Sequence, residues 1–152
     1  MAKLTNNERS PYTDVIRLTA ADLIAIGNAG TRQIATIPAG GAVTLCAVTN
    51  TVDIVGSTTL SIGIGTTLAT PVEFISALDV DGATVGLPTF NTGTSFVQTA
   101  GNTTIKGGVL PVGAASTATP IYIKVADSAV ASITAGEILI GLEIIDLTQH
   151  QA

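Results

Sequence analysis

The sequence predicts an all-β fold, an antiparallel β-sandwich with one or two short helical turns. Short runs in which hydrophobic and polar residues alternate recur along the chain, as they do in strands with one buried face. Clusters of Gly, Pro, Asn and Thr separate these runs. About eight short strands, without a regular alternation of strands and helices, are typical of a sandwich or a small barrel.

Three segments show the alternation most clearly. Ile121–Val125 places its β-branched residues on one face and Tyr122 and Lys124 on the other. Glu137–Ile145 alternates aliphatic residues with Glu and Gly, and Leu60–Gly65 alternates large residues with tiny ones. Weaker candidates for strands are Asp14–Leu18, Gln33–Ile37, Val43–Thr49, Ser95–Thr99 and Thr103–Lys106.

The same alternation predicts the hydrophobic core. Residues that share the apolar face of these strands are expected to be buried: Ile62, Ile64, Ile123, Val125, Ile138, Ile140 and Leu142. Cys46, the only cysteine, alternates within Val43–Thr49, so we expect a packed, reduced thiol without a function of its own. One cysteine allows no intrachain disulfide, and the first nine residues lack the apolar run of a signal peptide. We therefore expect synthesis in a reducing compartment.

Two segments are predicted to form short helical turns. Thr19–Asp22 has the pattern of a capped helix start, with Leu23 and Ile26 facing inward and Gly27 placed to end the helix. Thr70–Glu73 resembles a capping box with Pro71 at the first helical position. In that second turn, Phe74, Ile75 and Leu78 would face inward.

The chain is expected to hold one domain with polar ends. We assign residues 1–13 to a polar N-terminal arm, residues 14–147 to the sandwich, and residues 148–152 to a C-terminal tail. The arm carries basic residues, Asn and Pro without a periodic pattern. Such ends either fray in solution or become ordered on a neighbouring subunit, and the sequence favours neither.

The composition narrows the possible functions. Charged residues are only 11% of the chain, against about 25% in an average soluble domain, while 46% are hydrophobic and the mean hydropathy is +0.55. A disordered chain has the opposite composition. A net charge of −5 disfavours nucleic-acid binding, which needs a basic surface. We expect no membrane segment, because no uncharged apolar run reaches about 18 residues and aromatic residues are only 3%.

We expect no enzyme activity and no catalytic, cofactor-binding or metal site. The only histidine, His150, lies in the tail, where no rigid surroundings would orient an imidazole for catalysis. One cysteine and one histidine far apart in the chain disfavour a zinc site. The glycine pairs Gly63–Gly65 and Gly107–Gly108 lack the residues that follow in phosphate-binding loops, so we interpret them as strand glycines or turns.

Asp79 and Asp81, followed by Gly82, form the one acidic cluster. This pattern can begin a calcium loop, but the twelfth position of such a loop is Phe90 here rather than a bidentate Glu. We predict a turn in which Asp and Gly have their usual roles, and whether this turn binds an ion is left open.

Scarce charges instead favour a role in assembly. Surfaces of Thr, Ser, Ala and Asn cost less to desolvate than ionic ones, and charged residues are depleted at the cores of protein interfaces. No small-molecule substrate is expected. We predict a homo-oligomer that also binds a larger protein structure.

Three segments resemble the capsid decoration (cement) proteins and other small β-sandwich virion proteins of tailed bacteriophages: Ser61–Thr66, Pro71–Ile75 and Ala135–Ile138. The resemblance covers roughly residues 31–147 in style and order. It implies a jelly-roll-like sandwich, usually trimeric, that is made in the host cytoplasm and binds the major capsid protein on the outside of the virion. Two alternatives stay open: another virion component, such as a tail, fibre or adaptor domain, and a cellular carbohydrate-binding or adhesive module.

Overall fold

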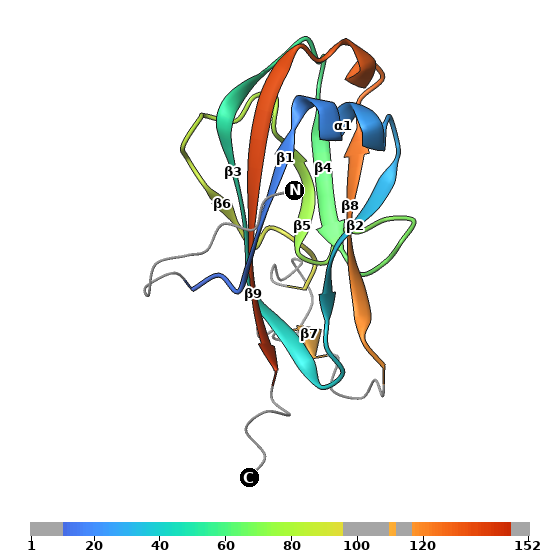
Figure 1. The fold of residues 1–152 in the computed structure, drawn as a ribbon, viewed down its shortest axis with the longest axis vertical. Helices are drawn as coiled ribbons and strands as arrows, with labels where there is room; N and C mark the ends of the chain where they lie inside the picture. Colours follow the sequence, from blue (N-terminus) through green and yellow to red (C-terminus); the bar gives the residue numbers. More distant parts are fainter. Residues whose placement is uncertain (1–10, 96–109, 112–116, 147–152) are drawn as a thin grey trace, which may run out of the picture.

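The computed structural model describes residues 11–95, 110–111 and 117–146, and it confirms the antiparallel β-sandwich (Figure 1). One sheet has the order β1-β9-β3-β6, with β7 also paired to β3. The other sheet has the order β2-β8-β4-β5. All strand pairs are antiparallel. The jelly-roll-like connectivity stays a prediction.

Six predicted strands are confirmed. Their bounds in the structure are β1 Asp14–Thr19, β2 Thr31–Ile37, β3 Gly41–Val55, β4 Ser61–Gly65, β8 Thr119–Ala126 and β9 Ala135–Asp146. The prediction for β3 was too short, because register shifts after Val43, Asn50 and Val52 interrupt its alternation. Of the two remaining candidates, Ser95 lies in a turn, and residues 96–99 and 103–106 are outside the described part.

The first helical turn is confirmed as α1, Ala20–Ile26. Thr19 caps it: the backbone N–H of Asp22 donates to Thr19 Oγ1, and the Thr19 N–H donates to the Asp22 carboxylate at 3.0 Å. Leu23 is buried against the core, and Gly27 follows the helix at φ 81°, a conformation that glycine adopts without strain. A single-turn 3₁₀ helix, η1 Val130–Ser132, was not predicted.

The second helical turn was wrong. Ile75–Asp79 forms strand β5, which pairs with β4, and Pro71–Phe74 is the connection leading into it. The Phe74 N–H donates to the Ile64 carbonyl at 2.9 Å, so pairing across the sheet replaces the hydrogen bonds that a helix would have made. Phe74 and Ile75 are nevertheless buried, as expected. Tertiary pairing has overridden the local pattern.

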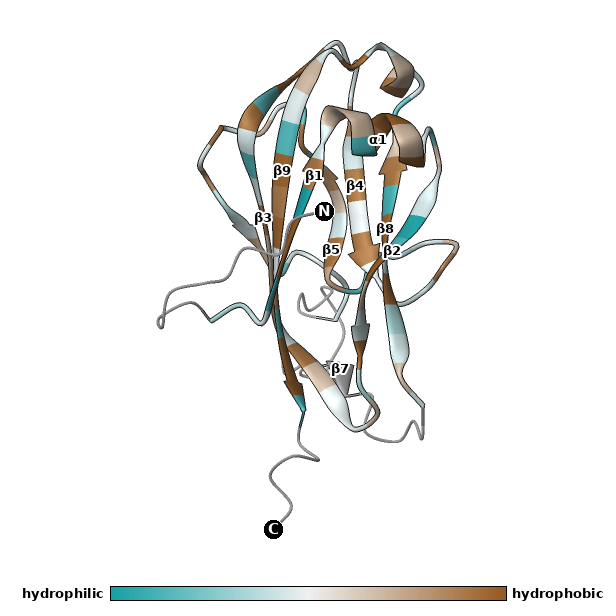
Figure 2. Cartoon of the chain, in the orientation of Figure 1, coloured by the Kyte–Doolittle hydropathy of each residue, from teal (hydrophilic) through white to brown (hydrophobic). Residues whose placement is uncertain are grey.

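The core lies between the two sheets and matches the prediction. All seven residues expected to be buried are at most 1% exposed. Figure 2 shows hydrophobic residues alternating with less hydrophobic ones along β4 and β8. The Ile and Val residues of these two strands belong to the core cluster. The short strands β6 (Thr89–Phe90) and β7 (Leu110–Pro111) lie at the other edge of β3 from β9.

Candidate functional site

Cys46 is a packed thiol, as predicted. The residue lies in β3 and is 0% exposed, and burial raises the pKa of its thiol to about 12. Because the thiolate is the reactive form, almost none is present at neutral pH.

Native protein is expected to resist labelling at Cys46 by a thiol reagent and to react only after unfolding. Cys46→Ser should destabilise the fold mildly and leave assembly unchanged, since the hydroxyl occupies nearly the same volume but is more polar. Titration with a chromogenic disulfide, with and without denaturant, measures this. Rapid labelling without denaturant would contradict the burial.

Asp79 and Asp81 form the predicted turn. The Asp79 carboxylate accepts the backbone N–H groups of Asp81 and Gly82 at 3.0 and 3.1 Å. The Ser57 hydroxyl donates to the Asp81 carboxylate. Within the described residues, no three His, Cys, Asp or Glu side chains are grouped so that they could hold a metal ion. His150 and Gly107–Gly108 lie outside that part of the chain.

Glu73 organises a loop that the sequence reasoning assigned to a helix. Its carboxylate accepts the backbone N–H groups of Thr66 at 3.0 Å and Val72 at 3.1 Å, and the hydroxyl of Thr67. The glycines of β4 make this approach possible: a Cβ on Gly65 would lie 1.8 Å from Glu73 Oε2. The alternation of large and tiny residues in β4 was the sequence signal for a segment packed this closely on the strand.

Burial raises the pKa of Glu73, but the hydrogen bonds from Thr67 and from the backbone of Glu73, Val72 and Thr66 outweigh it, so the pKa is lowered overall. A carboxyl whose pKa is lower in the folded state stabilises the fold above the unfolded-state pKa of about 4.5.

We therefore expect stability to fall as the pH drops below about 4.5 through the lowered pKa of Glu73. In Glu73→Gln this part of the acid dependence should be smaller, and the variant should be less stable than the native chain at pH 7. Urea unfolding at several pH values measures both effects. Equal acid dependence of the two proteins would show that the Glu73 contacts contribute no pH-dependent stability.

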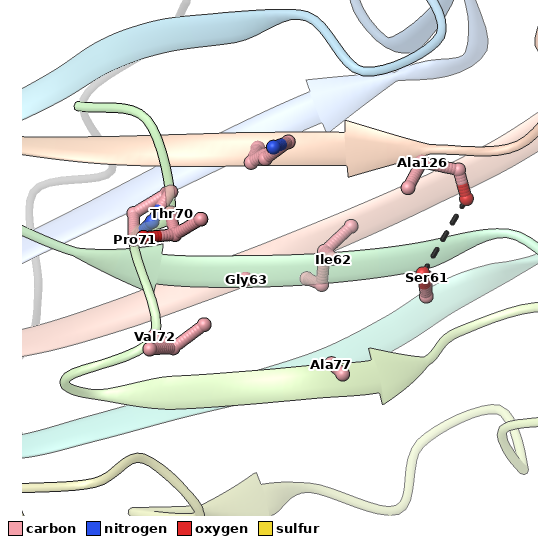
Figure 3. Close-up of a pocket in the computed structure, with 9 residues that line it drawn as sticks. Ser61, Ile62, Gly63, Thr70, Pro71, Val72, Ala77 and Ala126 are labelled. Atoms are coloured by element: carbon pink, nitrogen blue, oxygen red, sulfur yellow. Dashed lines mark hydrogen bonds between the residues drawn. The ribbon is translucent and has the colours of Figure 1, made fainter. Parts of the chain in front are cut away.

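A pocket lies on the outer face of the β2-β8-β4-β5 sheet, and we call it the Gly63 pocket (Figure 3). Its volume is about 170 Å³ and its lining is largely apolar. Gly63, which has no side chain, opens the floor on β4, and Pro71 and Val72 cross over the strand as one wall. The small side chains of Ala77 and Ala126 line the remaining sides, so the pocket is shallow there. Lys124 also lines the pocket and pairs across the sheet with Gly63; its ammonium group donates to the Ala69 carbonyl at 2.8 Å.

Large hydrophobic residues are exposed on β3 and on the segment that runs into β6, at the edge of β3 opposite β9. We call this group the hydrophobic edge. Its members are Val52, Val85, Leu87 and Phe90, between 45% and 64% exposed. Two contacts hold their segments together: Gly86 N–H donates to the Asn50 carbonyl at 2.8 Å, and Phe90 pairs with Ala47. Asn50 is buried, and its amide also donates to the Val80 carbonyl at 2.6 Å. The loop between β5 and β6 is therefore hydrogen-bonded to Asn50 of β3 near its start, at Val80, and near its end, at Gly86.

The described part of the chain is strongly acidic. It has ten carboxylate side chains and three cations, a formal charge of −7, so the remaining residues carry +2 of the total of −5. Arg17 pairs with Glu137 and Arg32 with Asp22, whereas Lys124 makes no ion pair within the described residues. Asp53, beside Val52, likewise pairs with no described cation.

The end of the predicted arm lies against the sandwich. Thr13 joins β9, since its N–H donates to the Leu142 carbonyl at 2.8 Å and its hydroxyl accepts the Ile144 N–H at 2.9 Å. The Tyr12 ring lies over Gly141, where a Cβ would stand 2.7 Å from the ring. Residues 1–10 are outside the described part.

The pocket is apolar and small, and the hydrophobic edge is exposed. In the described part of the chain, no helix has the length and hydrophobicity needed to span a bilayer. No protein-family model, curated protein sequence or solved structure matches this chain.

Proposed function

We propose that this chain is a capsid decoration protein of a tailed bacteriophage, which forms a homo-oligomer on the outside of the head and binds the major capsid protein. The observation that carries the proposal is the hydrophobic edge: four large hydrophobic side chains, each nearly half exposed or more, in a chain with 11% charged residues. Exposed hydrophobic residues that are grouped along one sheet edge, rather than scattered singly, favour a protein interface. The resemblance of Ser61–Thr66, Pro71–Ile75 and Ala135–Ile138 to decoration proteins supports the location on a phage head.

A stable contact should bury more than about 1,000 Å² in total. Contacts with sister copies and contacts with the capsid shell would together supply this buried area. The N-terminal arm is the candidate for reaching the shell. Its last two residues, Tyr12 and Thr13, are attached to β9, and its sequence offers hydrogen-bonding and charged groups in Asn6, Asn7 and Arg9.

Light scattering of the purified protein, followed by co-sedimentation with phage capsids that lack it, tests the proposal. We expect a trimer of the 15.2 kDa chain that sediments with the capsids. Deleting residues 2–10 should weaken capsid binding while far-UV circular dichroism stays unchanged. A strictly monomeric protein that does not sediment with capsids would exclude the decoration role, and binding to purified tails instead would favour a tail component.

A further inference from the structure

The Gly63 pocket matches in size the most exposed side chain of the hydrophobic edge, Leu87. Leu87 is 64% exposed, more than any other large hydrophobic residue in the described part, and it lies in the loop between β5 and β6. The pocket holds about 170 Å³. An apolar cavity of about 150 Å³ admits a benzene molecule, so the pocket has room for one leucine side chain.

We propose that Leu87 of one copy inserts into the Gly63 pocket of the next copy, so that the chain assembles head to tail. This inference rests on the homo-oligomer of the proposed function and names the surfaces that form it. The two surfaces differ, and such a heterologous contact repeats from copy to copy until the rotation closes a ring.

Leu87 cannot reach the Gly63 pocket of its own copy, because the two surfaces lie on different sheets. Gly86 and Phe90, on either side of Leu87, are attached to Asn50 and Ala47 of β3 in one sheet. The pocket opens on the outer face of the other sheet, over β4 and β8, on the side away from the core. Leu87 therefore reaches such a pocket only in a second molecule.

The charges favour a second copy as the occupant. Two copies with a net charge of −5 repel each other unless they meet where carboxylates are few. Residues 83–90 contain no charged residue, and the only charged residue lining the pocket is Lys124. The chain is acidic overall, so a loop without carboxylates can approach a pocket whose one charge is a cation without repulsion between like charges.

The pocket is formed before any partner arrives. A Cβ on Gly63 would lie 2.4 Å from the Pro71 carbonyl oxygen, so the wall rests directly on the strand. Glu73 fixes the same segment through the N–H groups of Thr66 and Val72. A preformed pocket loses little conformational freedom on binding, which favours insertion of a single side chain.

Leu87→Asp and Ala126→Leu test the two halves of the contact separately. Leu87→Asp places a charge on the inserting side chain, whereas Ala126→Leu fills the pocket from β8. The matched controls are Ile24→Asp, at another exposed hydrophobic residue on α1, and Thr36→Leu, at an exposed residue of β2 outside the pocket. Sedimentation velocity should show monomers for the two test variants and the native oligomer for both controls. Circular dichroism verifies folding, and Ser61→Leu replaces Ala126→Leu if the latter does not fold.

An equimolar mixture of the two test variants decides whether the contact is head to tail. The Ala126→Leu chain keeps its Leu87, and the Leu87→Asp chain keeps its pocket, so the mixture should form a one-to-one dimer and stop there. Two monomers that ignore each other, or test variants that keep the native oligomer, would overturn the inference and leave the proposed function intact. A native protein that is monomeric would overturn the inference, and one that also fails to sediment with capsids would overturn the proposed function.

Discussion

Ile140→Ala is expected to lower the free energy of unfolding by about 2–5 kcal/mol, the usual cost of removing a large aliphatic side chain from a rigid core. Ile140 is 0% exposed and lies in the middle of β9. It pairs with Ile16 of β1 on one side and with Val48 of β3 on the other, so the cavity would open where three strands meet. Urea unfolding followed by circular dichroism measures the change.

Ile145→Ala is the matched control. Ile145 lies near the end of the same strand and is only partly buried, so its truncation should cost clearly less. A loss below about 1 kcal/mol for Ile140→Ala, or equal losses for the two variants, would mean that β9 presents its other face to the core.

Gly93→Ala is expected to be the second severe substitution. A Cβ at this position would lie 2.3 Å from the carbonyl carbon and oxygen of Glu73 and from the carbonyl carbon of Phe74. These are backbone atoms, which cannot rotate away, and the Gly93 N–H donates to the Phe74 carbonyl at 2.8 Å. Overpacking of this kind costs about 1–3 kcal/mol or more, because the backbone must shift. The loss is read from the urea midpoint.

Gly82→Ala serves as the control for Gly93→Ala. Its Cβ would come no closer than 3.3 Å to any heavy atom, the Asp79 carboxylate, which is the end of a side chain that can move. We expect a change within about 0.5 kcal/mol. If Gly93→Ala were equally mild, the segment around Glu73 would have to be free to move away from residue 93, and the rigid wall of the Gly63 pocket would be in doubt.

The parts of the fold that follow from local periodicity could be predicted from the sequence. The alternation in β8 and β9 is regular because each strand has one face on the core, and the capping residues of α1 are all within one turn. The segment after Thr70 misled the prediction because Glu73 does accept backbone N–H groups, as in a helix cap. One of its donors is Thr66, in the turn after β4, and no local pattern reveals such a partner.

The candidate surfaces could not be predicted for a related reason. The sequence assigns Leu87 and Phe90 to no strand, and they are exposed because their segment is attached to the outer edge of β3 through Asn50 and Ala47. The Gly63 pocket depends on where Pro71 crosses the sheet, which is fixed by contacts between segments far apart in the chain. The glycines of β4 were visible in the sequence, but the sequence did not show that Pro71 and Glu73 pack against them.

The attachment of Tyr12 and Thr13 to β9 fixes the point at which the first ten residues join the sandwich. Fully extended, ten residues span at most about 33–36 Å. Under the proposed role, a second capsid contact carried within that length would stay near the surface that the sandwich binds. Linking two contacts in this way raises the effective concentration of the second contact. Two individually weak contacts would then hold together by avidity, and exchanging the first ten residues would change the capsid that the protein binds without altering the sandwich.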